Sequence, residues 1–237
     1  MDLEQLLALQ DLDTRLDQLD HRLTHDQALA DLTAAEQALA TVERQILELF
    51  AERDVVRQEQ KRLEDEAAAV EAKIAKDTAT LYGGTVTAHK ELESLQHELA
   101  TLKERLGGFD EAVLEQMELA EPMDARAAEL ADEKTAAEAD VEAKRGAVTV
   151  MQAEVGAEHD TAAAERAALA ATLPDDLLAR YEKLRKGLGG QGAARLAPGG
   201  RCEGCHLTLP SAEYAELKRA PADEVHVCPE CGRILVR

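Results

Sequence analysis

Two pairs of cysteines near the end of the chain are the residues whose type and spacing most directly predict chemistry. The pairs are Cys202-Glu203-Gly204-Cys205 and Cys228-Pro229-Glu230-Cys231, and the sequence has four cysteines in all. Two thiolates separated by two residues grip one metal ion from a tight turn, and two such pairs complete a closed tetrahedral shell that suits Zn²⁺. The predicted ligands of one structural zinc ion are Cys202, Cys205, Cys228 and Cys231.

Other uses of these cysteines fit the sequence less well. A thioredoxin-like redox site would have a single C-x-x-C beside a βαβ pattern, and two disulfides would be unusual in a chain expected to be cytosolic. His206 and His226 lie beside the pairs, but four thiolates already fill the shell. We expect Gly204 and Gly232 to supply the permissive backbone that the two turns need.

Charge is divided unevenly along the chain. The net charge is −21, yet the region from Lys183 to Arg237 has nine basic and six acidic residues. That region therefore carries +3 and the preceding residues −24. A strongly acidic body repels nucleic acid and membrane surfaces, so a contact with a polyanion would belong to the C-terminal region.

Cations near the cysteines are the candidates for phosphate contacts, although ordinary surface charge that steadies the thiolates is an equally good interpretation. Tyr214 is the single aromatic residue after Tyr181, so a base-stacking platform is not expected. The candidates are Arg195, Arg201, Lys218, Arg219 and Arg233, with Arg237 at the end of the chain.

The first three quarters of the chain have the composition and periodicity of long helices. Aromatic residues make up 2% of the sequence and charged residues 32%. Leucines from Leu9 to Leu23 follow a 3-4 spacing, and a second run of the same kind begins at Leu32, which is typical of a coiled-coil seam. The two runs are out of phase, so we predict a break between Thr24 and Gln27, a pair that resembles a capping box.

A glycine pair divides this helical region. Gly83 and Gly84 end the second run, and the seam restarts at Leu92 and continues to Leu169. Helices of similar length on either side of a short turn are expected to pair antiparallel. We therefore predict a mostly α fold: a long antiparallel coiled-coil hairpin over residues 1–172, turning at about 82–88, followed by a small C-terminal zinc ribbon with short β-strands.

The remaining boundaries follow from glycine and strand signals. Residues 173–190 are expected to contain a short helix, 177–186, and a glycine-rich linker. Residues 191–237 form the predicted C4 zinc ribbon. Its short strands are expected at 193–196, 207–209 and 234–236.

Several function classes find no support in the sequence. It shows no P-loop, nucleophile elbow or dinucleotide-binding turn, and helical spacing places its many carboxylates on outer faces, so we expect no enzyme. The start lacks the basic and apolar regions of a signal peptide, and no apolar run approaches the ~20 residues of a membrane span. We expect a cytoplasmic protein without membrane contact.

With these motifs in hand, the chain resembles a bacterial family of coiled-coil hairpins that end in a C4-type zinc ribbon, over nearly its whole length. The resemblance rests on Leu81-Tyr82-Gly83-Gly84-Thr85-Val86, on Lys90-Glu91-Leu92 and on the two cysteine motifs. The family often has Asn-Pro before Lys-Glu-Leu, where this chain has Ala88-His89. The resemblance implies a nucleic-acid-binding or regulatory adaptor. It also implies partners among transcription components, such as an alternative sigma factor, or among secretion components.

Two function hypotheses follow. In the first, a non-enzymatic zinc-binding adaptor docks a protein partner through the coiled coil, and its zinc ribbon contacts DNA, RNA or the transcription machinery. In the second, the chain is a protein-only scaffold or chaperone-like factor with no nucleic-acid binding.

Overall fold

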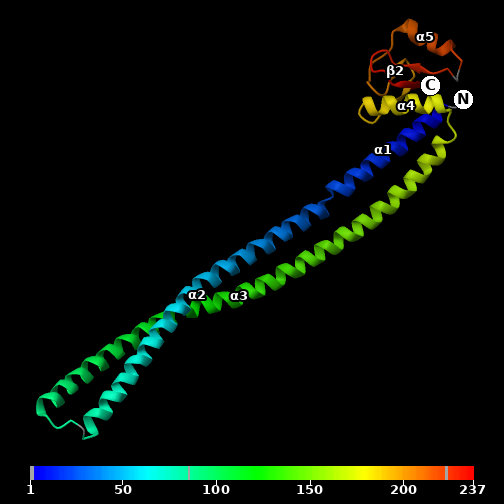
Figure 1. The fold of residues 1–237 in the computed structure, drawn as a ribbon. Coiled ribbons are helices and arrows are strands. Elements are labelled where there is room, and N and C mark those ends of the chain that lie inside the picture. The colour runs from blue at the N-terminus through cyan, green and yellow to red at the C-terminus, as the bar shows by residue number, and fades with distance from the viewer. Residues whose placement is uncertain (1–2, 85, 222–223) are drawn as a thin grey trace. The chain divides into compact units, whose positions relative to one another are not determined.

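The computed structural model describes residues 3–84, 86–221 and 224–237 (Figure 1). These residues are mostly helical, with a small sheet near the C-terminus, which confirms the predicted fold class. The helices are α1 (Glu4–His25), α2 (Gln27–Tyr82), α3 (His89–Ala170), α4 (Asp175–Gly187) and α5 (Ser211–Arg219). The strands are β1 (Ala193–Ala197), β2 (Arg201–Cys202), β3 (His226–Val227) and β4 (Ile234–Val236).

The chain forms two compact units. The hairpin unit contains Thr33–Ala143, and the ribbon unit contains Met1–Leu32 together with Lys144–Arg237.

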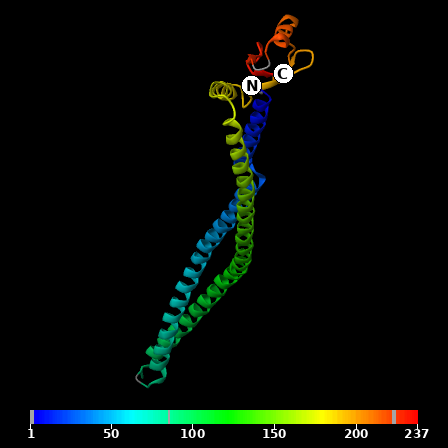
Figure 2. The ribbon, with the colours of Figure 1, turned by 90° about the vertical axis from the view of Figure 1, so that its right-hand side faces the viewer.

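In the hairpin unit, α2 and α3 pair antiparallel. α2 ends at Tyr82 and α3 begins at His89, so the connection spans residues 83–88 (Figure 2). Ion pairs join Glu43 to Lys134 at 3.1 Å, Arg57 to Asp124 at 2.6 Å, and Lys73 to Glu98. The residue numbers rise along one helix as they fall along the other, which is the register of a hairpin.

The seam that heptad spacing predicts is the buried face of this hairpin. Leu and Val side chains at the predicted positions are buried or half-buried, while the charged residues between them are largely exposed. Such a stripe packs by interdigitating side chains and does not need aromatic residues. The buried seam residues of this unit are Ala35, Leu63, Val70, Leu99, Leu102, Leu130 and Val141.

The break between α1 and α2 lies where the phase of the leucines changes, as predicted. Asp26 has an extended backbone, with ψ of 148°. The interpretation of Thr24 and Gln27 as a capping box is wrong. The Thr24 hydroxyl donates back to the carbonyl of Asp20 at 3.0 Å, whereas the Asp26 carboxylate accepts the N–H of Ala28 at 3.0 Å and so caps α2.

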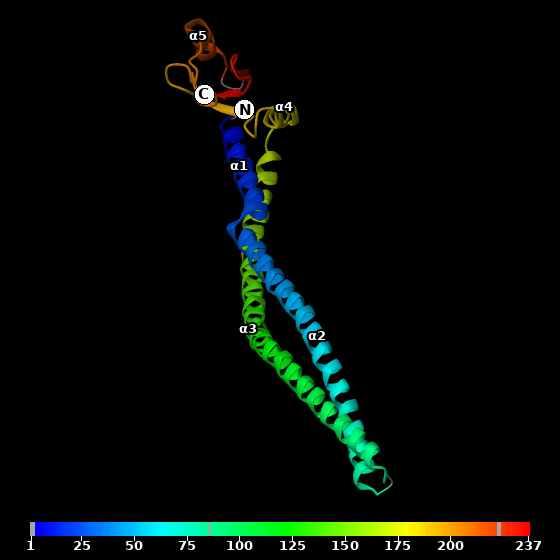
Figure 3. The ribbon, with the colours of Figure 1, turned by 90° about the vertical axis from the view of Figure 1, so that its left-hand side faces the viewer.

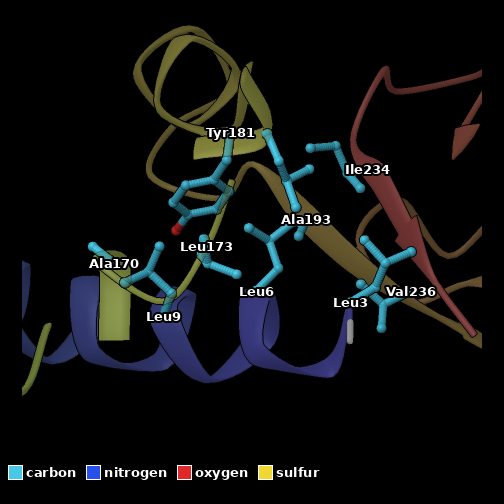
Figure 4. Packing of buried hydrophobic residues seen from close by; sticks show 10 residues of the cluster. Leu3, Leu6, Leu9, Ala170, Leu173, Tyr181, Ala193, Ile234 and Val236 are labelled. Atoms are coloured by element: carbon cyan, nitrogen blue, oxygen red, sulfur yellow. The ribbon is translucent and has the colours of Figure 1, made fainter. Parts of the chain in front are cut away.

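In the ribbon unit, α1 packs against both α3 and the sheet. Leu19 of α1 lies in a cluster with Met151 and Val155 of α3, whose C-terminal part runs beside α1 (Figure 3). The stripe on α1 also begins earlier than the predicted seam. Leu3, Leu6 and Leu9 form one hydrophobic core with residues of α4 and the sheet (Figure 4). The other buried members of this core are Ala170, Leu173, Leu177, Tyr181, Ala193, Ile234 and Val236.

The sheet has the strand order β2-β1-β4-β3. β1 pairs parallel with β4, with Ala193 opposite Ile234, and antiparallel with β2. The strands predicted near 193–196 and 234–236 are confirmed. The strand predicted at 207–209 is wrong: only Thr208 forms an isolated bridge, to Arg201, because this segment comes directly out of a tight cysteine turn. Helix α5 was not predicted.

A buried polar cluster joins α1, α3 and α4 in the ribbon unit. Asp13 of α1 is 3% exposed. Its carboxylate accepts hydrogen bonds from the Tyr181 hydroxyl at 2.8 Å and from Arg166 Nε at 3.1 Å, and Arg185 forms an ion pair with it at 3.5 Å. Burial, together with the hydrogen bond to this carboxylate, raises the pKa of Tyr181 far above its ordinary value. The cluster thus ties α1 to α3 and α4.

We predict that Tyr181→Phe destabilises the protein by about 1–3 kcal/mol, because it removes a donor from a buried carboxylate while leaving the ring in place. Denaturant unfolding at neutral pH measures the change. Tyr82→Phe is the control, since Tyr82 is 81% exposed and its change should stay within about 0.5 kcal/mol. Equal unfolding free energies for Tyr181→Phe and the unsubstituted protein would contradict the role of the cluster.

Candidate metal centre

The two cysteine turns follow the same backbone path. In the first, the N–H of His206 donates to the carbonyl of Cys202 at 2.8 Å; in the second, the N–H of Gly232 donates to that of Cys228 at 2.8 Å. The residue after each second cysteine is left-handed, with φ of 63° at His206 and 75° at Gly232. Each turn therefore aims two sulfur atoms at the same point.

The four sulfur atoms form a tetrahedral cage. All lie within 4.8 Å of one another, with Cys202 Sγ and Cys231 Sγ 3.9 Å apart and Cys205 Sγ and Cys228 Sγ 3.8 Å apart. Zn–S bonds of about 2.3 Å would place the corners of a regular tetrahedron about 3.8 Å apart. The cage therefore fits one Zn²⁺ with four protein ligands. Among the described residues, this is the group of His, Cys, Asp and Glu side chains close enough to hold a metal ion.

Glycine is needed in the two cysteine turns for two different physical reasons. Gly232 has the positive φ expected from the sequence. Gly204 does not, so the reason given for it is wrong: a Cβ there would lie 2.6 Å from Cδ of Arg233 and 2.9 Å from Cβ of Ala194. The left-handed position of the first turn belongs to His206 instead. Gly204 is needed because the second turn and the sheet approach it closely.

The environment of the thiols sets how protons compete with the metal. Burial raises the pKa of Cys202, and it raises that of Cys228 to about 12. Burial also acts to raise the pKa of Cys231, but hydrogen bonds from Arg233 and from neighbouring cysteines lower it to about 7. Because Zn²⁺ binds thiolates, it must displace protons from the buried thiols, and its affinity falls as the pH falls.

Neither neighbouring histidine belongs to the sulfur cage. The His206 ring lies 3.2 Å from the Arg201 guanidinium, and His226 lies 3.7 Å from the Glu224 carboxylate.

Three of the six cations proposed to contact phosphate are engaged within the ribbon unit. Arg237 donates to the carbonyl of Ala220 at 3.1 Å. Arg195 forms two hydrogen bonds of 2.8 Å to the carboxylate of Glu4 on α1. Arg233 donates to the carbonyls of Gln191 and Leu188, at 3.1 and 3.2 Å, and so joins the second turn to the loop after α4.

The other three present their charge at the surface. Arg201 and Arg219 are exposed, and the exposed Lys218 places its Nζ 5.1 Å from the centre of the Tyr214 ring. The Tyr214 hydroxyl in turn accepts the N–H of Gly199 at 3.2 Å. Phosphate binding by these side chains stays a prediction.

Comparison with known proteins decides the family. Residues 9–189 match the model of the CT398-like coiled coil hairpin domain, and residues 201–235 match that of the C4-type zinc ribbon domain. The chain belongs to the CT398-like coiled-coil hairpin family. The resemblance inferred from the turn and cysteine motifs is thereby confirmed, as are the zinc ribbon and its one structural zinc.

Relatives from mycobacteria match almost the whole chain. The uncharacterized proteins Rv2229c and MT2288 of Mycobacterium tuberculosis are each 36% identical over 98% of this chain and 94% of their own length. A solved structure from Mycobacterium smegmatis is 27% identical, with a TM-score of 0.89 over 99% of this chain and 97% of that one.

Two more distant structures share the fold. CT398 from Chlamydia trachomatis is 18% identical, with a TM-score of 0.75 over 99% of this chain and 96% of its own. The HP0958 protein from Helicobacter pylori is 20% identical, with a TM-score of 0.52 over the same shares of the two chains.

We predict about one zinc per chain by elemental analysis, and less than half of that after Cys228→Ser, because three thiolates leave the shell open. Because the ribbon strands share a hydrophobic core with α1, the same variant gives a second prediction. Hydrogen exchange should accelerate at Ile234–Val236 and also near Leu6 and Leu9 of α1. Unchanged zinc content, or an unchanged exchange rate in both segments, would contradict the account.

We predict that Gly204→Ala weakens zinc retention against a chelator. The added Cβ would push the side chains of Arg233 and Ala194 away from residue 204 and so distort the first turn. Gly146→Ala in α3 is the matched control, since a Cβ there meets open space. The control should retain zinc as the unsubstituted protein does and gain up to about 1 kcal/mol of stability. Equal zinc release from both variants would refute the packing role of Gly204.

Proposed function

We propose that the protein is a non-enzymatic adaptor of the cytoplasm. Its hairpin unit docks a protein partner, and its zinc ribbon contacts nucleic acid or the transcription machinery. The observation that carries the proposal is the closed four-sulfur cage, in a chain whose C-terminal region has a net charge of +3 and whose remainder is strongly acidic. Four protein ligands leave a tetrahedral Zn²⁺ no position for a substrate, so the metal holds a surface in shape. A reducing compartment keeps such thiols available for the metal.

Exposed cations on the ribbon support the nucleic-acid part of the proposal. Arg201, Lys218 and Arg219 are exposed, and they belong to the region of net +3. Phosphate contacts from such side chains give affinity without reading sequence. None of the described helices has the length and apolar character to span a bilayer.

A specific observation favours the protein-only scaffold as the second candidate. A cavity of about 360 Å³ on the ribbon has three acidic residues, Glu213, Glu216 and Glu224, among its lining residues. Carboxylates repel phosphate, so this side of the ribbon suits a protein with a basic side chain better than it suits nucleic acid.

A binding assay over a salt series distinguishes the two. We predict that the zinc-loaded full-length protein binds RNA or DNA with an affinity that falls steeply with salt. Replacing Arg201, Lys218 and Arg219 with Gln should weaken binding about tenfold or more and reduce the slope of log affinity against log salt by about 2–3. The full chain is needed because the ribbon shares its core with α1.

The matched control removes the same charge from the hairpin unit, by replacing the exposed residues Arg44, Lys61 and Lys103 with Gln. This variant should bind as the unsubstituted protein does. If no salt-sensitive binding occurs at micromolar concentration, the scaffold replaces the nucleic-acid adaptor. If both triple variants lose affinity equally, the ribbon is not the surface that contacts nucleic acid.

A further inference from the structure

Several large apolar side chains of the hairpin unit lie outside its seam. Leu114 and Met117 of α3 are 57% and 49% exposed. Together with Ala120, they line a cavity of about 430 Å³ that extends to Arg57 of α2. We call this cavity the mid-hairpin groove. Its lining residues are Arg57, Leu114, Met117, Glu118, Ala120, Glu121 and Asp124.

The groove continues onto α2 through an ion-pair cluster. Asp124 pairs with both Arg53, at 2.7 Å, and Arg57, at 2.6 Å. The Arg53 guanidinium lies 5.8 Å from the centre of the Phe50 ring, which is 44% exposed. From Leu114 past Asp124 to Phe50, the surface extends about 25 Å at 1.5 Å per helical residue. A helix of roughly 17 residues would cover it.

The charge around the groove is one-sided. Residues 110–125 of α3 contain six carboxylates and no Lys or Arg. Arg57, which lines the groove from α2, and its neighbour Arg53 are both paired with Asp124. Over the whole hairpin unit there are 27 acidic and 12 basic residues. A surface of this kind attracts Lys and Arg and repels an acidic partner.

The backbone adds an acceptor at the same place. Pro122 lies inside α3 and has no N–H, so the carbonyl of Glu118 lacks the donor that a helix normally supplies four residues later. Glu118 lines the groove. Its carboxylate and its carbonyl thus both offer acceptors to a donor-rich side chain.

We propose that the mid-hairpin groove binds an amphipathic helix of a partner protein, with Leu- or Met-type residues on one face and Lys or Arg on its flanks. The apolar face would cover Leu114 and Met117, and the basic flanks would pair with carboxylates such as Glu118 and Glu121. A second copy of this chain is a poor occupant, because it would bring two acidic surfaces together. This inference rests on the proposed docking role of the hairpin unit.

A designed peptide of about 20 residues tests the groove directly. The probe has Leu on one helical face and Lys on the flanking positions, and a second peptide replaces each Lys with Glu. Fluorescence anisotropy with zinc-loaded full-length protein measures both affinities. We expect the Lys peptide to bind and the Glu peptide to bind at least about tenfold more weakly.

Paired variants locate the binding. Leu114→Ser with Met117→Ser should weaken binding of the Lys peptide about tenfold or more. Leu119→Ser with Val150→Ser is the matched control, because these side chains are 52% and 57% exposed and lie outside the groove. The control should leave the affinity unchanged. Equal losses in both variants, or equal affinity for the Lys and Glu peptides, would overturn the proposal.

Two further outcomes would refute binding of a partner helix in the mid-hairpin groove and leave the other proposals unaffected. If sedimentation shows that the unsubstituted protein self-associates and that the Leu114 and Met117 variant does not, the occupant is a second copy. In host cells, a photo-crosslinking residue could yield a protein adduct from position 119 but not from position 117. That result would show that the groove is not the docking site. The docking role of the hairpin unit would then stand, at another face.

Discussion

The bond between four thiolates and one zinc ion is the constraint on which the ribbon depends. Its strands have two to five residues each, and β2 and β3 have only two. Ladders this short do not hold a sheet by hydrogen bonds alone. The cage fixes the first turn, where β2 ends at Cys202, and the second turn, which β4 follows. The sheet then closes on α1 through Ile234 and Val236. The ribbon is therefore stabilised by the metal on one side and by the first helix on the other.

The parts of the fold that sequence patterns predicted are those with a simple physical period. Heptad spacing located the seam and the phase change near Thr24, and cysteine spacing located the metal ligands. Patterns failed where the cause was a contact distant in sequence. The need for glycine at Gly204 comes from Arg233, and the ion pair of Arg195 comes from Glu4, 191 residues away. A left-handed His206 was also missed, because side-chain type alone predicts glycine there.

Charge is what connects the architecture with its proposed use. The hairpin unit is strongly acidic, and the ribbon carries its exposed cations beside a zinc cage that holds their backbone in place. Internal pairing of Arg195 and Arg233 shows that some of the basic residues near the cysteines serve the fold itself. Leu114 and Met117 of the mid-hairpin groove are exposed apolar side chains outside the buried seam of the hairpin unit.

X-ray absorption at the zinc edge of the purified full-length protein tests the central claim, a closed structural site, most directly. Four sulfur neighbours at about 2.3 Å, with no nitrogen or oxygen neighbour, is the predicted result. A shell that contains a water oxygen or a histidine nitrogen would contradict the account, because the metal would then have an open position or a ligand outside the four cysteines.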